Sequence, residues 1–207
     1  MDLYFSPLAC SMATRIAFYE AGQPANYLRV DTKASPKRVE DGTLFSTING
    51  MGQVPVLRTD DGELIRENPV ILHYVAERFP EAKLAPTDPA GRRQLQTWLS
   101  FIGSELHTGV FIVLLRPTAP EGAKAFARAE AAERFAFLEA HLSKQDYLLD
   151  AYSVADAYLF VILNWARAIG MDLAAWPAVV AYRDRVQARP AVAKALAEEF
   201  GLYKKAA

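Results

Sequence analysis

The change in apolar spacing near residue 80 constrains this chain more than any single motif. Before it, short segments with strand-like and helix-like spacing alternate, and after it the spacing is helical throughout. Three prolines, Pro80, Pro86 and Pro89, lie at the change and are typical of a linker. We therefore expect two domains joined through residues 81–89, which a length of 207 residues can accommodate.

The first eighty residues predict a sheet with both parallel and antiparallel strands. Period-two and helical spacings follow one another, with a turn at 60–62 inside the last pair of strands. A strand, a helix and a strand in succession give a parallel pair, and a hairpin adds an antiparallel pair. The expected elements are a strand at 2–5, a helix from 11 to 21, a strand around 28–30, and hairpin strands at 54–57 and 63–65.

A helix with a well-marked start closes this half. Asn68 is typical of an N-cap, and Pro69 suits the first helical turn, where no amide hydrogen is needed. Between the second strand and the hairpin, residues 33–50 predict a weak helix and an irregular loop. The sequence thus predicts a four-stranded mixed sheet with helices, the thioredoxin-like arrangement, as a domain of residues 1–80.

The second half predicts an all-helical domain of residues 90–207. Ser153 and Asp156 have the spacing of a capping box. They precede an apolar run, 157–165, that we expect in the interior of the bundle. The fold class is therefore α/β plus all-α. Other helices are expected from 88 to about 117, at 121–142, from Pro177 and from Pro190.

Composition argues against several classes of protein. With 23 basic and 24 acidic side chains the formal net charge is −1, which argues against binding a nucleic acid through its phosphates. The longest apolar run, 109–115, is far shorter than the roughly 18–20 residues of a membrane span, and we see no secretory signal. The single cysteine excludes an intrachain disulfide, so we expect a reducing, cytoplasmic setting and no membrane partner.

Cys10 is the first candidate for chemistry. It lies between the first strand and the first helix, where unpaired amides and the helix dipole favour a thiolate. The alternative is a small buried apolar side chain, which we rank second because of this position. Ala13 stands where a dithiol motif needs its second cysteine. Only one-thiol chemistry is therefore expected, with any mixed disulfide resolved by an external thiol.

Two loops supply candidates for binding a peptide-like ligand. Pro55 opens a strand beside a loop and is a candidate cis-proline, although a trans proline is the commoner case. Glu67 precedes a helix N-terminus, so its charge and the helix amides suit the two charges of an amino-acid head group. The structural alternative is that Asn68 is only an N-cap, and the two roles are compatible.

The long helix of the second half carries two further polar candidates. Leu106 continues the apolar stripe of that helix, so Glu105 and His107 are expected on its flanks. A single histidine on a helix usually lies at the surface or at the edge of a core. Three scattered histidines and one cysteine predict no metal site.

Taken together, these motifs resemble those of the cytosolic glutathione transferases over essentially the whole chain. Cys10 and residues 104–107 are most similar to the bacterial beta class, in which a cysteine approaches the glutathione sulfur. The matching segments are residues 3–7 with Cys10-Ser11, residues 52–57, residues 61–64, Glu67-Asn68 and residues 153–157.

The resemblance implies a homodimer that binds glutathione as co-substrate in the first domain and a small hydrophobic electrophile in the second. Val54 would pair its backbone with the cysteinyl part of glutathione, and Lys33 or Lys37 would meet the glycine carboxylate. The implied glutathione-binding residues are Leu8, Lys37, Gln53, Val54, cis Pro55, Glu67, Asn68, Glu105 and His107.

In the second domain the resemblance assigns two groups of residues. Glu105 and His107 would reach glutathione bound to the partner subunit. Phe111, Ile112 and Trp165 would line the electrophile site, although they are equally suitable core residues.

The working hypothesis for the mechanism is activation of the glutathione thiol. Amides near the first helix, with the side chains of Cys10 and Ser11, stabilise a thiolate that attacks an electrophilic carbon or a disulfide. Because an ionised Cys10 would repel that thiolate, Cys10 donates a hydrogen bond or forms a mixed disulfide. The alternatives are a glutathione-dependent dehalogenase or reductase on the same fold, and a non-catalytic binding protein. Only Met51 and Asn68, where the family commonly has other residues, support the last of these.

Overall fold

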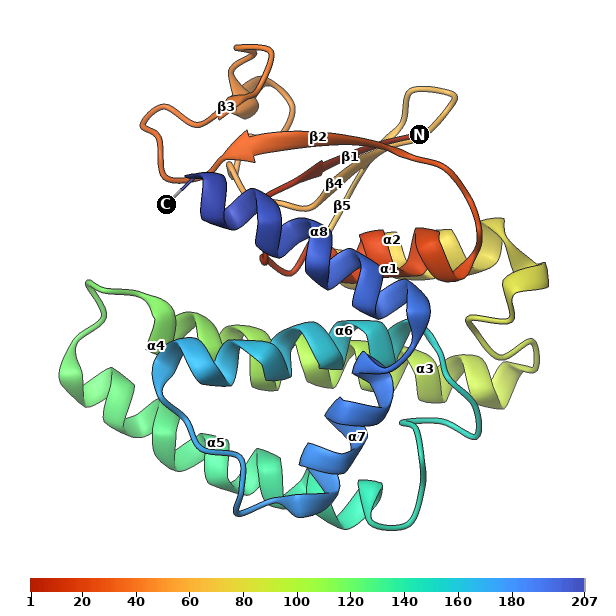
Figure 1. Cartoon of the computed structure of the whole chain (residues 1–207), viewed down its shortest axis with the longest axis vertical. Helices are drawn as coiled ribbons and strands as arrows, with labels where there is room; N and C mark the ends of the chain where they lie inside the picture. The colour runs from red at the N-terminus through yellow and green to blue at the C-terminus, as the bar shows by residue number, and fades with distance from the viewer. Residues whose placement is uncertain (207) are drawn as a thin grey trace. The chain divides into compact units, whose positions relative to one another are not determined.

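The computed structural model describes residues 1–206 and divides into two compact units. One unit contains residues 1–84 together with the segment that begins at Pro190. The other contains residues 85–189. Figure 1 shows the strands and helices of the first unit, and the helices of the second.

The first unit is built on a mixed five-stranded sheet in the order β3-β2-β1-β4-β5. Strand β1 pairs parallel with β2 and antiparallel with β4, which confirms the predicted mixture of strand directions. The fifth strand, β3, corrects the prediction, since it lies in the region expected to be weak helix and loop. The strands are β1 (Asp2–Phe5), β2 (Asn26–Asp31), β3 (Arg38–Val39), β4 (Val56–Arg58) and β5 (Leu64–Arg66).

Side chains of β1 point alternately to the two faces of the sheet, and both faces are buried. Tyr4 belongs to a cluster with Phe45, from the 3₁₀ turn η1 (Phe45–Thr47), at 6.0 Å between ring centroids. Leu3 and Phe5, on the opposite face of the strand, are also buried. Helices α1 (Met12–Glu20) and α2 (Asn68–Arg78) pack together along the sheet (Figure 1).

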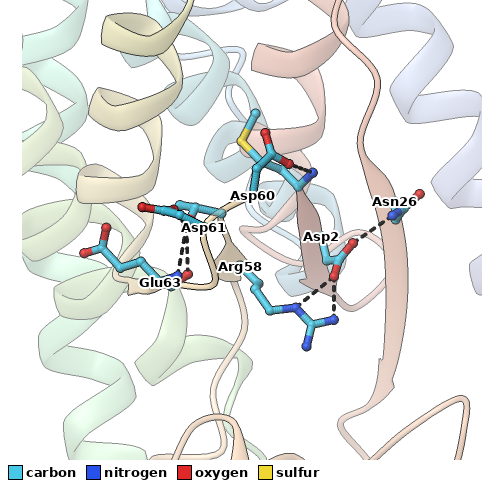
Figure 2. A network of polar contacts seen from close by, with 8 residues as sticks. Asp2, Asn26, Arg58, Asp60, Asp61 and Glu63 are labelled. Carbon is cyan, nitrogen blue, oxygen red and sulfur yellow. Dashed lines mark hydrogen bonds and ion pairs between the residues drawn. The ribbon is translucent and has the colours of Figure 1, made fainter.

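A polar network joins the outer ends of β1, β2 and β4 (Figure 2). Arg58 donates from Nε and from a terminal nitrogen to one carboxylate oxygen of Asp2, at 2.9 and 2.5 Å. Asn26 donates to the other oxygen at 2.8 Å. Burial acts to raise the pKa of Asp2, but the hydrogen bonds from Asn26 and Arg58 outweigh it, so the pKa is lowered. The network therefore connects three neighbouring strands at one end.

Helix α8 (Pro190–Ala206) belongs to the first unit, whereas residues 90–207 were expected to form one helical domain. It packs against α1, as Figure 1 shows. The reason lies in its inner face, where Val192, Ala195 and Glu199 recur at helical spacing and are fully buried. Pro190 begins this helix, as the sequence predicts.

The second unit confirms most of the predicted helices. The expected capping box before α6 is present, with Ser153 accepting from the first turn and Asp156 accepting from the Ser153 amide. Residues 154–163 of α6 are all buried, so this helix is the interior of the unit. The helical segments are α3 (Pro89–Phe101), the π-helix η3 (Ile102–Ile112), α4 (Val113–Leu115), α5 (Glu121–Leu142), α6 (Val154–Asn164), the 3₁₀ turn η4 (Trp165–Ile169) and α7 (Pro177–Gln187).

Residues 89–115 form one continuous helical stretch through α3, η3 and α4. At 27 residues, with a mean hydropathy of 1.5 in its most apolar window, this stretch has the length and composition of a membrane span. The longest uninterrupted apolar run, 109–115, covers only part of this stretch. Helices α5 and α6 pack against η3, and Glu105 of η3 forms an ion pair with Arg134 of α5. These contacts are typical of a core helix in a bundle.

Candidate functional site

The loop between β1 and α1 is folded tightly on itself. Ser11 Oγ donates to the Ser6 carbonyl at 3.2 Å and accepts from the Ser6 amide at 3.3 Å. Leu8, in the middle of the loop, has a left-handed backbone with φ of 62°. Because the Ser11 side chain is fully buried and joined to Ser6, its observed role is to close the loop.

Cys10 lies at the end of this loop, with 7% of its surface exposed. Its Sγ donates to the Val54 carbonyl oxygen at 3.5 Å. Burial raises the pKa of Cys10 to about 12, although the amides of Cys10 and Ser11 act to lower it. The expected easy ionisation is therefore wrong: the helix amides are in place, but desolvation outweighs them. Cys10 is a neutral thiol and a hydrogen-bond donor.

The peptide bond between Val54 and Pro55 is cis, as the resemblance implies. Asn49, which is buried, supports the preceding turn by donating to the Gln53 carbonyl at 2.8 Å. The Gln53 side chain is exposed, and Pro55 is buried. Together with the Cys10 contact, this geometry sets the Val54 backbone beside the Cys10 sulfur.

Of the two lysines considered for the glycine carboxylate, Lys37 is the one next to this loop. Its ammonium donates to the Gly52 carbonyl at 2.7 Å. The Lys33 ammonium instead lies 5.7 Å from the centre of the Tyr203 ring on α8. The structure thus brings Lys37, and not Lys33, to the segment that leads into the cis-proline.

Helix α2 begins one residue earlier than the sequence suggested. Glu67 is the N-cap of α2, in a left-handed backbone with φ of 66°, and is exposed. Asn68 is the first helical residue and is buried. Its side-chain amide donates to the Cys10 carbonyl at 3.2 Å, and its side-chain oxygen accepts from Thr14 Oγ1 at 3.2 Å. The prediction of Asn68 as N-cap is therefore wrong, and its side chain braces the Cys10 loop.

In the second unit, Glu105 and His107 occupy different environments on η3. Glu105 is bound by Arg134, which donates to one carboxylate oxygen at 3.2 and 3.0 Å. The His107 Nδ1 lies 2.6 Å from the Tyr158 hydroxyl, and its ring lies 5.0 Å from that of Trp165. Burial lowers the pKa of His107 to about 4, so the imidazole is neutral at neutral pH.

The three predicted electrophile-site residues separate by depth. Phe111 is fully buried and packs against Phe135 and Trp165 at 6.4 and 6.2 Å between ring centroids. Ile112 and Trp165 are half-buried. Phe111 therefore lies in the core, beside the Trp165 ring.

Sequence reasoning missed Glu199 of α8, whose carboxylate accepts from the Leu8 amide at 2.7 Å. The residue is 191 positions away in the chain, so no local motif links the two. A signal was present nonetheless, because Glu199 occupies an apolar stripe position of α8. An acidic side chain in such a stripe indicates a buried partner. Among residues 1–206, no three His, Cys, Asp or Glu side chains gather as a metal site requires.

Comparison with known proteins decides the family. Residues 9–78 match the glutathione S-transferase N-terminal domain, and residues 80–190 match the C-terminal domain. The chain belongs to the glutathione S-transferase family. It is 35% identical to the glutathione S-transferase GstA of Escherichia coli O157:H7 over 201 residues, which is 96% of this chain and 98% of that protein.

Solved glutathione S-transferases superpose on nearly the whole chain. A sphingomonad enzyme complexed with glutathione has a TM-score of 0.91 and 41% identity, covering 96% of this chain and 98% of its own. A beta-class enzyme of Sphingomonas chungbukensis has a TM-score of 0.90 and 40% identity, with the same coverage. The chain is thus a glutathione S-transferase with glutathione as its co-substrate, and the expected fold class is confirmed.

Proposed function

We propose that glutathione binds in the first unit with its sulfur near Cys10 and its cysteinyl backbone along Val54. The observation that carries this is the contact between Cys10 Sγ and the Val54 carbonyl, at the cis peptide bond. A peptide that pairs with the Val54 backbone would bring its own sulfur to the position that the Cys10 thiol faces. Lys37 and Glu67 lie at the adjoining segments and would hold the two charged ends of the tripeptide.

In this proposal Cys10 acts as a neutral thiol in conjugation, whereas in disulfide exchange it gives up its proton and forms the mixed disulfide. In conjugation its S–H turns from the Val54 carbonyl and donates to the glutathione thiolate. That thiolate forms the new bond to an electrophilic carbon while the leaving group departs with the bonding electrons. A neutral donor does not repel the thiolate, whereas an ionised Cys10 would. Because the Ser11 hydroxyl is bound to Ser6, we assign thiol activation to Cys10 and loop closure to Ser11.

Replacing Cys10 tests this division of labour. Cys10→Ala should suppress disulfide reduction far more than conjugation. Disulfide exchange through a mixed disulfide needs the sulfur itself, whereas conjugation loses only one hydrogen bond, roughly a tenfold effect. Cys10→Ser, which keeps a donor, is the control and should retain conjugation. Initial rates with a chlorinated nitroaromatic and with a small mixed disulfide measure both activities, and an equal loss of both would refute the proposal.

Binding of glutathione itself is tested by calorimetric titration of the wild type and Glu67→Gln. We expect binding by the wild type at millimolar glutathione and weaker binding by the variant, because one charged contact is lost. An absence of binding by the wild type would favour the non-catalytic alternative.

A panel of chlorinated, disulfide and nitroaromatic substrates separates a general transferase from a dehalogenase or reductase.

We also infer that the enzyme is a homodimer that works in the cytoplasm on small hydrophobic electrophiles. Helix α5 exposes Phe126 and Phe137, with 67% and 54% of their surfaces accessible. Phe137 joins Trp98 and Phe101 of α3 in one aromatic cluster, at 5.7 and 5.3 Å between ring centroids. Apolar rings exposed in this way are typical of protein interfaces. Sedimentation of the wild type and Phe137→Asp tests this, and a monomeric wild type would contradict it.

A further inference from the structure

The carboxylate of Glu199, which is distant in the sequence, binds the backbone of the Cys10 loop. Glu199 has no exposed surface, and one of its oxygens accepts from the Leu8 amide at 2.7 Å. Leu8 is the residue whose left-handed backbone turns the loop. A non-glycine residue pays for that conformation unless its surroundings enforce it, and the Glu199 contact is one such constraint.

The second oxygen of Glu199 belongs to a buried ion pair. It lies 2.9 Å from Nε of Arg15 on α1. The Arg15 guanidinium lies 3.8 Å from the centre of the Tyr27 ring and 4.5 Å from that of Phe5, so it is held between two rings. Replacing a buried ion pair with apolar side chains is often neutral for stability. Stability alone therefore does not require the pair as a whole, although removal of Glu199 by itself takes this partner from the buried Arg15 charge. What the carboxylate positions is a further use of the pair.

We propose that Glu199 is a positioning residue for catalysis: its carboxylate fixes the Leu8 amide and thereby holds the Cys10 thiol beside the Val54 carbonyl. The proposal rests on the proposed role of Cys10. Ser11 and Asn68 act on this loop at Ser6 and at the Cys10 carbonyl. Within the loop the Ala9 amide donates to the Ser6 carbonyl, and Glu199 adds a side-chain contact at Leu8, in the middle.

The charge of Glu199 connects this contact to pH. Burial raises its pKa to about 7, against the opposing effect of Arg15. The other groups around the pair are Tyr19 of α1, Glu198 of α8 and Tyr27 of β2. Above pH 7 the Leu8 amide meets a carboxylate, and such charge-assisted hydrogen bonds are the stronger ones. The charge of Glu199 also acts to raise the pKa of Cys10.

Three variants separate positioning from packing. Glu199→Leu removes the acceptor, Glu199→Gln keeps an amide oxygen for Leu8 but no charge, and Glu198→Gln is the matched control. Glu198 pairs with the same Arg15 at 3.3 Å, is partly exposed and is bound by Tyr19 instead of the loop. The readouts are hydrogen exchange of the Leu8 amide, alkylation of Cys10 by iodoacetamide without glutathione, and kcat and KM for glutathione from pH 6 to 8.

In Glu199→Leu we expect Leu8 exchange and Cys10 alkylation to rise roughly 10- to 100-fold, as loss of a charged hydrogen bond implies, with KM for glutathione raised. Glu199→Gln should recover most of the protection of the Leu8 amide and of the Cys10 thiol. In the wild type the alkylation rate should change near pH 7, where Glu199 ionises, and Glu199→Gln should lack this change. Glu198→Gln should behave as the wild type.

Unchanged exchange and alkylation in both Glu199 variants, or equal effects of Glu198→Gln, would overturn the proposal. If Glu199→Leu does not fold, the alkylation rate of Glu199→Gln as a function of pH decides alone, and a profile equal to that of the wild type would overturn the proposal. Exchange and alkylation need no glutathione, so they report on Glu199 even if the proposed glutathione site fails its own test.

Discussion

Burial is the main influence on the protonation of Cys10 and His107. Cys10 lies where helix amides favour a thiolate, yet desolvation raises its pKa to about 12. His107 is held neutral for the same reason, with its Nδ1 beside the Tyr158 hydroxyl. The position of Cys10 in the chain was readable from the sequence, but its exposure was not, because the Val54 carbonyl that covers the sulfur comes from another loop.

His107 should make the protein less stable in acid. Its pKa is about 4 in the folded state and about 6.5 when exposed, so the unfolded chain binds the extra proton between these values. The contribution of His107 to the free energy of unfolding is therefore complete above pH 6.5 and is lost as the pH falls towards 4. In His107→Gln this part of the pH dependence should vanish, as measured by urea unfolding at pH 4.5 and 7. The control is His73→Gln, at the half-exposed histidine of α2. If the free energy of unfolding changes with pH equally in the wild type and in His107→Gln, His107 is not the group responsible.

At the scale of elements, local signals placed most helices correctly and failed where a distant partner intervened. The Ser153–Asp156 capping box and Pro177 identified α6 and α7, since both signals act within one helical turn. Asn68 was misassigned, because its amide serves the Cys10 carbonyl 58 residues away.

Asp156 should be among the most sensitive positions of the second unit. It accepts from the Leu148 and Ser153 amides at 2.9 and 2.8 Å, and from the Tyr182 hydroxyl at 2.9 Å, all of them buried. Asp156→Ala leaves these donors without a partner, so we expect it to lower the free energy of unfolding by about 3 kcal/mol or more. Chemical denaturation measures this. Asp172→Ala, an exposed turn residue that accepts from one amide, should cost less than about 1 kcal/mol, and similar costs for the two would refute the argument.

The π-helix η3 should depend on Gly109. A Cβ added there would lie 3.0 Å from the Ser104 carbonyl oxygen, five residues earlier on the same helix. Gly109→Ala should therefore destabilise by about 1–3 kcal/mol, read from the shift in thermal unfolding. Gly122→Ala in α5, where an added Cβ meets nothing within 4 Å, should instead be neutral or stabilising by up to about 1 kcal/mol. The same sign for both substitutions would show that helix propensity alone governs them.

At the scale of the whole molecule, the proposed glutathione residues Cys10, Val54 and Glu67 all belong to the unit of residues 1–84 and 190 onward. Saturating glutathione should therefore increase amide protection mainly in this unit, and at 100 times its dissociation constant it should stabilise the folded state by about 2.7 kcal/mol. Hydrogen exchange with and without glutathione measures both effects. S-methylglutathione, which lacks the thiol, is the control for contacts of the Cys10 sulfur. Protection confined to residues 85–189 would contradict the proposed site.

The family and the order of elements could be read from the sequence, and the supporting contacts of the site could not. Cys10 and Glu67 stand at helix starts that the local sequence marks, and the role of Val54 follows from the resemblance to the family. Thr14, Asn49 and Glu199 act through partners set by the tertiary fold, and no spacing connects them to those partners. The fifth strand, β3, was missed because two residues carry no readable period.

The membership of α8 in the first unit has a consequence for how the protein is made. The ribosome releases the strands and the Cys10 loop early, but the carboxylate that binds Leu8 emerges 191 residues later. The half that is synthesised first is thus the half that is completed last. A nascent chain stalled before residue 190 carries the Cys10 loop without the Glu199 contact, so the thiol acquires its final setting only after α8 has been synthesised.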